Sequence, residues 1–194
     1  MAHATGIPDD ADCLHSVIAT APDRLPRWPA EGNPKGEYMV ERILAVWLVL
    51  ASGVQLGTLW IMKTSILPML NSLAYDRYVQ VCQLIDMHVF HPIALWNGLS
   101  CTVVGVGLAI AAPNAASSAL FVAGSLSMAV VGATSEGVNR PIWRQIERWS
   151  PHRLKDAGWS TKRDRWNLAH QVRTYGAAVA LCCFASAAVL IGTL

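Results

Sequence analysis

The chain has 194 residues, of which 53% are apolar and only 14% are charged, and its net charge is +2. A soluble domain usually contains about 25% charged residues, so this composition excludes an ordinary soluble protein and indicates a membrane protein. The basic residues adjoin long apolar segments and belong to no recognisable nucleic-acid-binding fold, so we expect no nucleic acid partner.

Residues 1–42 form an N-terminal arm that contains only short apolar runs, and we expect the arm to lie outside the membrane. The remainder, residues 43–194, contains four stretches without Asp, Glu, Lys, Arg or His. About 20 helical residues at about 1.5 Å each cross a hydrocarbon core of about 30 Å. The sequence therefore predicts an all-α fold, an integral membrane four-helix bundle, with spans at Ile43–Met62, Ile93–Ala112, Ala115–Thr134 and Thr174–Leu194.

The first span contains a small-residue motif, Gly53-Val-Gln-Leu-Gly57. Such glycines allow membrane helices to approach closely, either within one bundle or between two copies of a chain. We favour packing within the bundle, and the alternative is a seam that forms a homo-oligomer. The amide of Gln55 is expected to bond to a neighbouring helix.

The first connection is too long and too periodic for a loose loop. Val81, Ile85 and His88 recur at helical spacing, as do Leu84, Met87 and His91. We therefore predict an extra amphipathic helix from about Leu73 that is kinked at Pro92 and continues into the second span.

The third connection contains nine of the fifteen Lys and Arg residues, between Arg140 and Arg173, and we expect a short helix in it. With Lys63 and Arg77, 11 basic residues lie on one side of the bundle and 4 on the other. Basic residues are enriched in cytoplasmic loops. We therefore expect a multi-pass protein of the cytoplasmic membrane, with the third connection in the cytoplasm and both termini outside.

Polar side chains gather at the ends of three spans. Because successive spans cross the membrane in opposite directions, these three ends lie at the same depth. His88 and His91 precede the second span, Glu136 and Asn139 follow the third, and the stripe Trp166, His170 and Arg173 enters the fourth. Ionisable groups at membrane depth usually face the bundle interior and are candidates for function. Structural roles stay open: the histidines could bond to carbonyls freed by Pro92, and Arg173 could reach lipid phosphates.

Histidine and carboxylate side chains from three helices also suggest a metal-dependent membrane oxidase. His88, His91, His170 and Glu136 would form a mixed imidazole–carboxylate ligand set, which suits Cu, Fe or Zn. Histidines three residues apart are common by chance, so we keep this hypothesis as an alternative. A third hypothesis is a non-catalytic accessory subunit whose basic connection binds a partner protein or anionic membrane lipid.

The segments Asn139-Arg-Pro-Ile-Trp143 and Arg165-Trp166-Asn-Leu-Ala-His170-Gln-Val-Arg173 resemble the anthrone oxygenase-like family of small four-span membrane proteins. Leu67-Pro68 and Gln83 also resemble that family's first connection. The resemblance covers residues 44–194, but Ile142-Trp143 stands where the family has a second Asn, and the arm and the His88–His91 pair are not family features.

The resemblance implies an oxygenase (a monooxygenase of secondary metabolism) that uses O₂ on a hydrophobic, polycyclic phenolic substrate without a bound redox cofactor. In this interpretation His170 is the base that removes an acidic proton, and Arg173 and Asn139 stabilise the oxyanion. Trp166 would stack on the flat substrate, and we assign His88 and His91 to substrate binding as well.

Overall fold

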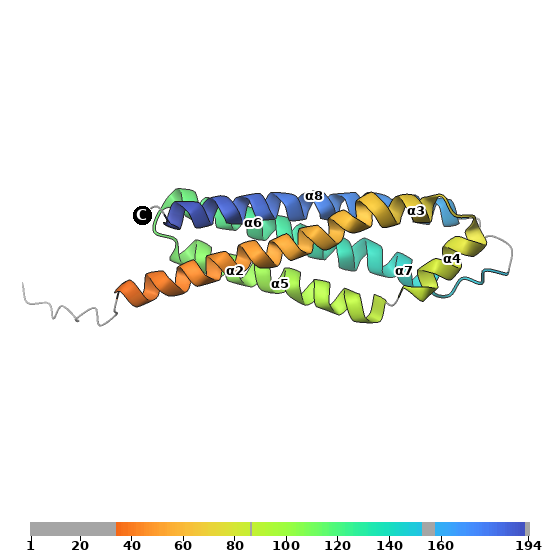
Figure 1. Cartoon of the computed structure of the whole chain (residues 1–194), viewed down its shortest axis with the longest axis horizontal. Coiled ribbons are helices and arrows are strands. Elements are labelled where there is room, and N and C mark those ends of the chain that lie inside the picture. The colour runs from red at the N-terminus through yellow and green to blue at the C-terminus, as the bar shows by residue number, and fades with distance from the viewer. Residues whose placement is uncertain (1–33, 86, 153–157, 193–194) are drawn as a thin grey trace, which may run out of the picture. The chain divides into compact units, whose positions relative to one another are not determined.

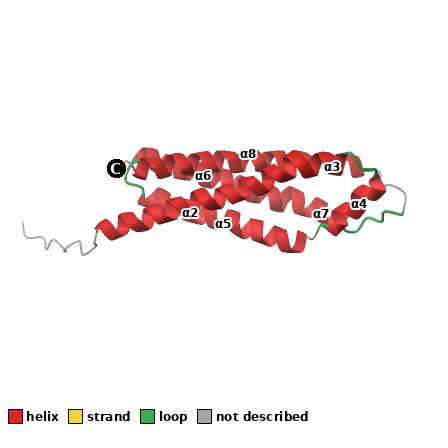
Figure 2. Cartoon of the chain, in the orientation of Figure 1, coloured by secondary structure: helices red, strands yellow, loops and turns green. Residues whose placement is uncertain are grey.

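The computed structural model describes residues 34–85, 87–152 and 158–192. Every regular element in these ranges is helical, and none of the described residues forms a strand (Figure 2). Long helical stretches lie alongside one another with alternating direction (Figure 1). The predicted all-α bundle is therefore confirmed, whereas residues 1–33 of the expected N-terminal arm lie outside the described residues.

The elements follow in a simple order along the chain. The first long stretch consists of α2 (Pro34–Ile61), the π-helix η1 (Met62–Ile66) and α3 (Leu67–Asn71). Next come α4 (Tyr75–Leu84) and α5 (Met87–Ala111). The third stretch joins α6 (Ala115–Thr134), the π-helix η2 (Ser135–Asn139) and α7 (Arg140–Ile146), and the last helix is α8 (Trp159–Gly192).

Four of these stretches are long and apolar enough to cross a membrane, namely Met39–Asn71, His91–Ala111, Ala115–Ile146 and Trp159–Gly192. They contain the described parts of the four predicted spans except Ala112, which follows the end of α5. Three of them have 32 to 34 residues, so they are about 50 Å long and exceed a hydrocarbon core by about 20 Å. Most of the additional helical residues lie in the segments that we predicted to be the first and third connections.

The four long stretches pack in a ring, in which α8 and α5 each contact both α2 and α6. Small side chains fill much of the interior, and the largest buried rings there are Phe121 and Phe184. A Cβ atom added at Gly124 would lie 2.5 Å from the ring of Phe184, so only glycine allows α6 to approach α8 at this point. The close helix packing therefore depends on small residues, as is usual in lipid.

The predicted extra helix between the first two spans is confirmed by α4, but its predicted continuation into the second span is wrong. The helix α4 ends at Leu84, Ile85 is extended with φ −75° and ψ 107°, and α5 begins at Met87. The break allows α4 to pack across the end of α7, where the amide of Gln83 donates to the carbonyls of Ile146 (3.2 Å) and Trp149 (2.8 Å). These contacts satisfy carbonyls that a helix end leaves without partners.

Both π-helices end just before a proline. The N–H of Leu67 donates to the carbonyl of Met62 before Pro68, and the N–H of Arg140 donates to the carbonyl of Ser135 before Pro141. Proline has no N–H and its ring collides with the carbonyl four residues earlier. A single wide turn relieves that collision and keeps each stretch continuous, so the predicted helix of the third connection is an extension of the third span.

The interpretation of the Gly53–Gly57 motif as packing within the bundle is wrong. A Cβ atom added at either glycine would lie more than 4 Å from every described atom outside the adjoining backbone of the same helix. The expected partner of Gln55 is confirmed, because Oε1 of Gln55 accepts from the amide of Asn97 on α5 at 3.1 Å. Helix α2 therefore contacts α5 through polar side chains, and no neighbouring helix approaches it closely at the two glycines.

A second hydrophobic cluster, here called the aromatic cluster, lies at the end where the helices exceed the apolar core. It brings together α3, α4, α7 and the first turns of α8. Its buried members are Leu67, Leu70, Tyr78, Val79, Cys82, Ile142, Trp143, Ile146, Trp159 and Trp166. Burial of these side chains explains why the helices continue beyond the charge-free stretches.

Candidate functional site

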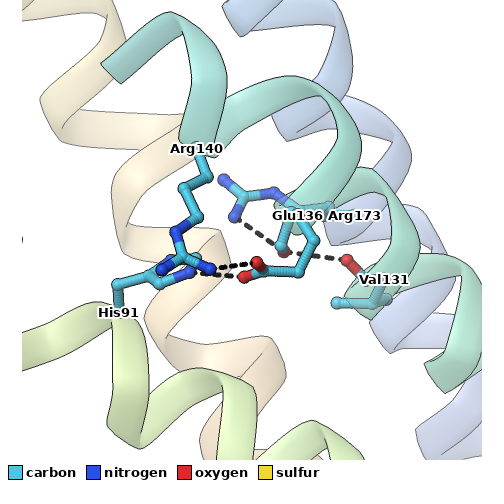
Figure 3. Close-up of polar contacts among 6 residues, drawn as sticks. His91, Val131, Glu136, Arg140 and Arg173 are labelled. Carbon is cyan, nitrogen blue, oxygen red and sulfur yellow. Dashed lines mark hydrogen bonds and ion pairs between the residues drawn. The ribbon is translucent and has the colours of Figure 1, made fainter. Parts of the chain in front are cut away.

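Ionisable side chains form a layer between the two hydrophobic clusters. Lys63 follows the charge-free part of α2, His91 precedes that of α5, Glu136 follows that of α6, and Arg173 precedes that of α8. Hydrogen bonds join α5 to η2 and η2 to α8 at this level (Figure 3). The structure therefore brings together polar groups of three segments that are distant in the sequence.

His91, Glu136 and Arg140 form one hydrogen-bonded group. Nε2 of His91 lies 2.6 Å from Oε1 of Glu136, and a guanidinium N–H of Arg140 donates to Oε2 at 2.5 Å (Figure 3). The side chains of His91 and Glu136 are 18% and 35% exposed. Because both carboxylate oxygens accept hydrogen bonds, the arrangement is that of an ionised carboxylate that orients an imidazole.

The guanidinium of Arg173 contacts neutral acceptors. It donates to Oγ of Ser135 at 3.1 Å and to Nδ1 of His170 at 2.7 Å. The amide of Asn139 is satisfied when its oxygen faces the guanidinium, where it accepts from Nε at 3.0 Å. No carboxylate in the described ranges lies within ion-pair distance of Arg173, so its positive charge is not neutralised by them.

His170 is 1% exposed, and both of its ring nitrogens have partners. A guanidinium can only donate, so Nδ1 accepts from Arg173 and Nε2 carries the proton. Nε2 then donates to the carbonyl of Leu59, 3.1 Å away, in the last turn of α2. The sequence predicted His170 as a base, but this arrangement leaves no nitrogen lone pair directed at a substrate.

Trp166 belongs to the aromatic cluster. It is 2% exposed, and its ring centroid lies 6.1 Å from that of Trp143 and 6.2 Å from that of His170. A substrate could stack on this indole only after neighbouring side chains had moved. Trp159, at 6% exposed, lies in the same cluster against Tyr75 and Tyr78.

The four residues proposed as metal ligands do not form one group. His91 and Glu136 meet each other, whereas His170 contacts Arg173 and Leu59. The backbone of His88 lies in α5, but its side chain is outside the described residues. No three His, Cys, Asp or Glu side chains in the described part of the chain are grouped to hold a metal ion.

Three members of the polar layer were not among the predicted site residues. Arg140 and Ser135 contact Glu136 and Arg173, respectively. Lys63 donates to the hydroxyl of Tyr175 at 2.6 Å and lies 3.9 Å from the centroid of its ring. The signal for Arg140 was its spacing of four residues from Glu136 on one helical face.

Comparisons with protein families, with curated proteins and with solved structures gave no match to this chain. The interpretation of the polar layer therefore depends on the chemistry of its own side chains and on the resemblance of residues 139–173.

Proposed function

We propose that the protein is a membrane-embedded oxygenase that removes a proton from a hydrophobic, phenolic small molecule and lets the resulting anion react with O₂. One observation supports this most directly. A hydrogen-bonded imidazole–carboxylate pair and a guanidinium without a described carboxylate partner contact the same π-helix, η2, at the end of an apolar core. General bases and cations are the groups that this chemistry needs.

We assign the base role to His91 instead of His170. Nε2 of His91 donates to the carboxylate of Glu136, which leaves the lone pair of Nδ1 on the unprotonated side of the ring. Nδ1 has no hydrogen-bond partner among the residues described here. Glu136 would hold the imidazole in this tautomer and stabilise the imidazolium that forms, as carboxylates do in other histidine-dependent enzymes.

The reaction balances without an added cofactor. His91 takes one proton from an acidic methylene group, and Arg173 stabilises the enolate oxygen. The carbanion then gives two electrons to O₂ and forms a carbon–oxygen bond. The resulting peroxide anion takes the proton back from His91, and the hydroperoxide so formed loses its terminal OH and the remaining methylene hydrogen as water. The methylene becomes a carbonyl, so one CH₂ and one O₂ give one C=O and one H₂O.

The hypothesis of a metal-dependent oxidase has less support. Both nitrogens of His170 are hydrogen-bonded within the protein, and its partner Arg173 is a cation, which would repel a metal ion. Only His91 and Glu136 remain together among the candidate ligands with described side chains. Measurement of Cu, Fe and Zn in purified protein, with His91→Ala as a comparison, tests this hypothesis separately.

The proposed reaction is tested by oxygen consumption. Purified protein is mixed anaerobically with an anthrone, air is admitted, and quinone and O₂ are measured together. We expect one O₂ for each quinone and a fall of about 10²–10³-fold in rate for Arg173→Gln. Arg144→Gln is the matched control, because Arg144 is exposed on α7 and has no described contact with the polar layer.

Two results would count against the oxygenase. A rate of quinone formation equal to that in buffer would show that the protein does not have the proposed activity. Equal rates for the wild type, His91→Ala and Arg173→Gln would show that the polar layer is not the site. Either result would favour the non-catalytic accessory subunit.

The same proposal includes an orientation, with the polar layer near the cytoplasmic surface and both termini outside. The support is the basic charge of the third connection. Fusion of a periplasmic phosphatase to the C-terminus tests it, since the enzyme is active only when exported. An inactive fusion that is fully expressed would contradict this orientation.

A further inference from the structure

An apolar groove with a cavity volume of about 550 Å³ lies between the η2–α7 stretch and α8. Gly137, Val138 and Gln145 belong to one wall. Arg165, Leu168 and Val172 belong to the other, at positions i, i+3 and i+7 of a single helical face. The groove is separate from the polar contacts of Arg173, which involve Ser135 and Asn139 on η2.

The groove runs along the helices and changes in polarity from one end to the other. Thr134 and Val172 lie at or next to the ends of the charge-free stretches. Gln145 is 11 residues, or about 16 Å, farther along the first wall, and Arg165 is 7 residues, or about 10 Å, farther along the second. Arg165 is exposed and forms no ion pair with any residue of the described ranges. One end of the groove therefore continues the hydrocarbon-facing surface, and the other is positively charged.

The walls between these ends expose apolar side chains. Leu168 is 62% exposed, Val172 is 41% exposed and Val138 is 37% exposed. These residues lie just beyond the charge-free stretches, next to exposed charged residues of the same helices. Contact with an apolar chain would remove this surface from water.

We propose that the groove binds one anionic phospholipid. Its acyl chain lies along Val138, Leu168 and Val172, and its phosphate contacts Arg165 and the amide of Gln145. A phospholipid has the polarity that the groove requires, because its chain points toward the membrane interior and its negative charge toward the surface. This inference is independent of the proposed oxygenase activity.

Native mass spectrometry of the full-length protein tests the proposal. The protein is reconstituted in nanodiscs of equal phosphatidylglycerol and phosphatidylcholine and released into mild detergent, and the retained lipids are counted. We expect one phosphatidylglycerol per chain on the wild type. Arg165→Gln should retain about fivefold less of it, the effect of losing one cation near an anionic headgroup.

Two further variants distinguish lipid binding in the groove from a general attraction of anionic lipid to the positive charges of this region. Arg144→Gln removes an exposed cation of α7 that does not line the groove, and we expect it to retain the lipid as the wild type does. Leu168→Trp fills the groove at an exposed position and should displace the lipid without loss of folding, as monitored by thermal unfolding. Equal retention of phosphatidylcholine, unchanged retention in Arg165→Gln, or a bound non-lipid molecule would overturn the proposal.

Discussion

Arg173 is the side chain whose environment most constrains the function. Its guanidinium is held by a hydroxyl, an amide oxygen and an imidazole nitrogen, none of which has a negative charge. A partly buried cation in such surroundings attracts an anion, because neutral acceptors satisfy its hydrogen bonds without offsetting its charge. Asn139, at 6% exposed, is the partner that allows this arrangement to be tested.

Two substitutions of Asn139 should distinguish the effect of its hydrogen bond to Arg173 from the effect of the uncompensated charge of Arg173. Asn139→Leu leaves guanidinium donors without an acceptor and should lower the free energy of unfolding by about 1–3 kcal/mol. Asn139→Asp keeps an acceptor and adds the missing negative charge, so its loss of stability should be smaller while oxygen consumption still falls. Thermal unfolding in detergent measures the stability. If the Asp variant is the less stable of the two, Arg173 already has a carboxylate partner.

The stability of the protein at high pH tests whether the thiol of Cys82 is buried. Burial raises the pKa of its thiol to about 11, and burial also raises the pKa of the neighbouring Tyr78 hydroxyl. Because the folded-state pKa of Cys82 is the higher one, its contribution to stability is complete below pH 9 and is lost as the pH rises toward 11. That loss is up to about 3 kcal/mol. Unfolding at pH 8 to 11 should show a shallower decline for Cys82→Ala, and identical slopes would contradict the burial of this thiol.

At the scale of elements, the two π-turns decide which side chains reach the site. In η2 the wide turn directs Ser135 and Asn139 to Arg173, and Glu136 to His91 on the other side. In η1 it places Lys63 against Tyr175. Such turns are frequent at functional sites, because each extra residue in a turn changes the direction of every later side chain.

Deletion of Gly137 tests this interpretation of η2. Removal of one residue converts the five-residue turn to an ordinary α-turn and rotates Glu136 by about 100° relative to α7. The coupling energy between His91 and Glu136 in a double-mutant cycle should be about 1 kcal/mol in the wild type and near zero after the deletion. The coupling of Gln55 with Asn97, on the other side of the bundle, is the control and should not change. Persistence of the first coupling would show that the turn does not position Glu136.

The sequence was sufficient for the membrane-spanning core but not for the extensions. The apolar stretches of α2, α5, α6 and α8 are free of charge for about 20 residues, which only a bilayer explains. The turns from Ser135 to Ile146 and from Trp159 to Arg173 contain charges, and we interpreted them as connections. They are helical because they bury Trp143, Ile146 and Trp159 against α4, and such tertiary contacts are not encoded in local composition.

The sequence was sufficient to predict that the residues of the candidate site lie at one depth in the membrane. It was not sufficient to predict the direction in which each side chain points around its helix. Alternating spans required His91, Glu136, Asn139, His170 and Arg173 to lie at one end. Which of them meet depends on the π-turn in η2, so the pairing of His91 with Glu136 and the enclosure of His170 could not be predicted. The Pro141 signal was present, but whether proline kinks, ends or widens a helix depends on its neighbours.

At the scale of the molecule, the described helices contain two hydrophobic clusters with the polar layer between them. The aromatic cluster holds the ends of α3, α4, α7 and α8 and thereby fixes η2 against α8. Trp159 is central to it, with ring centroids 5.4 Å from Tyr75 and 5.5 Å from Tyr78. Trp96 is 67% exposed on α5 and provides a matched tryptophan outside both clusters.

Replacement of these two tryptophans should therefore differ in effect. Trp159→Ala should lower the free energy of unfolding by about 3–5 kcal/mol, the usual cost of removing a buried aromatic ring. Trp96→Ala should change it by less than about 1 kcal/mol. Unfolding followed by circular dichroism in one detergent provides the comparison. Similar effects of the two substitutions would mean that the aromatic cluster is only a set of surface anchors.

The central claim is that His91, oriented by Glu136, removes a proton from a substrate. Anaerobic deuterium exchange tests that step without oxygen: an anthrone is incubated with the protein in D₂O, and loss of its methylene proton signal is followed by NMR. We predict faster exchange with the wild type and Arg144→Gln than in buffer, and a reduction of about 10²–10⁴-fold in the catalysed rate for His91→Ala. Exchange that is no faster than in buffer, or that is unchanged in His91→Ala, would contradict the assignment.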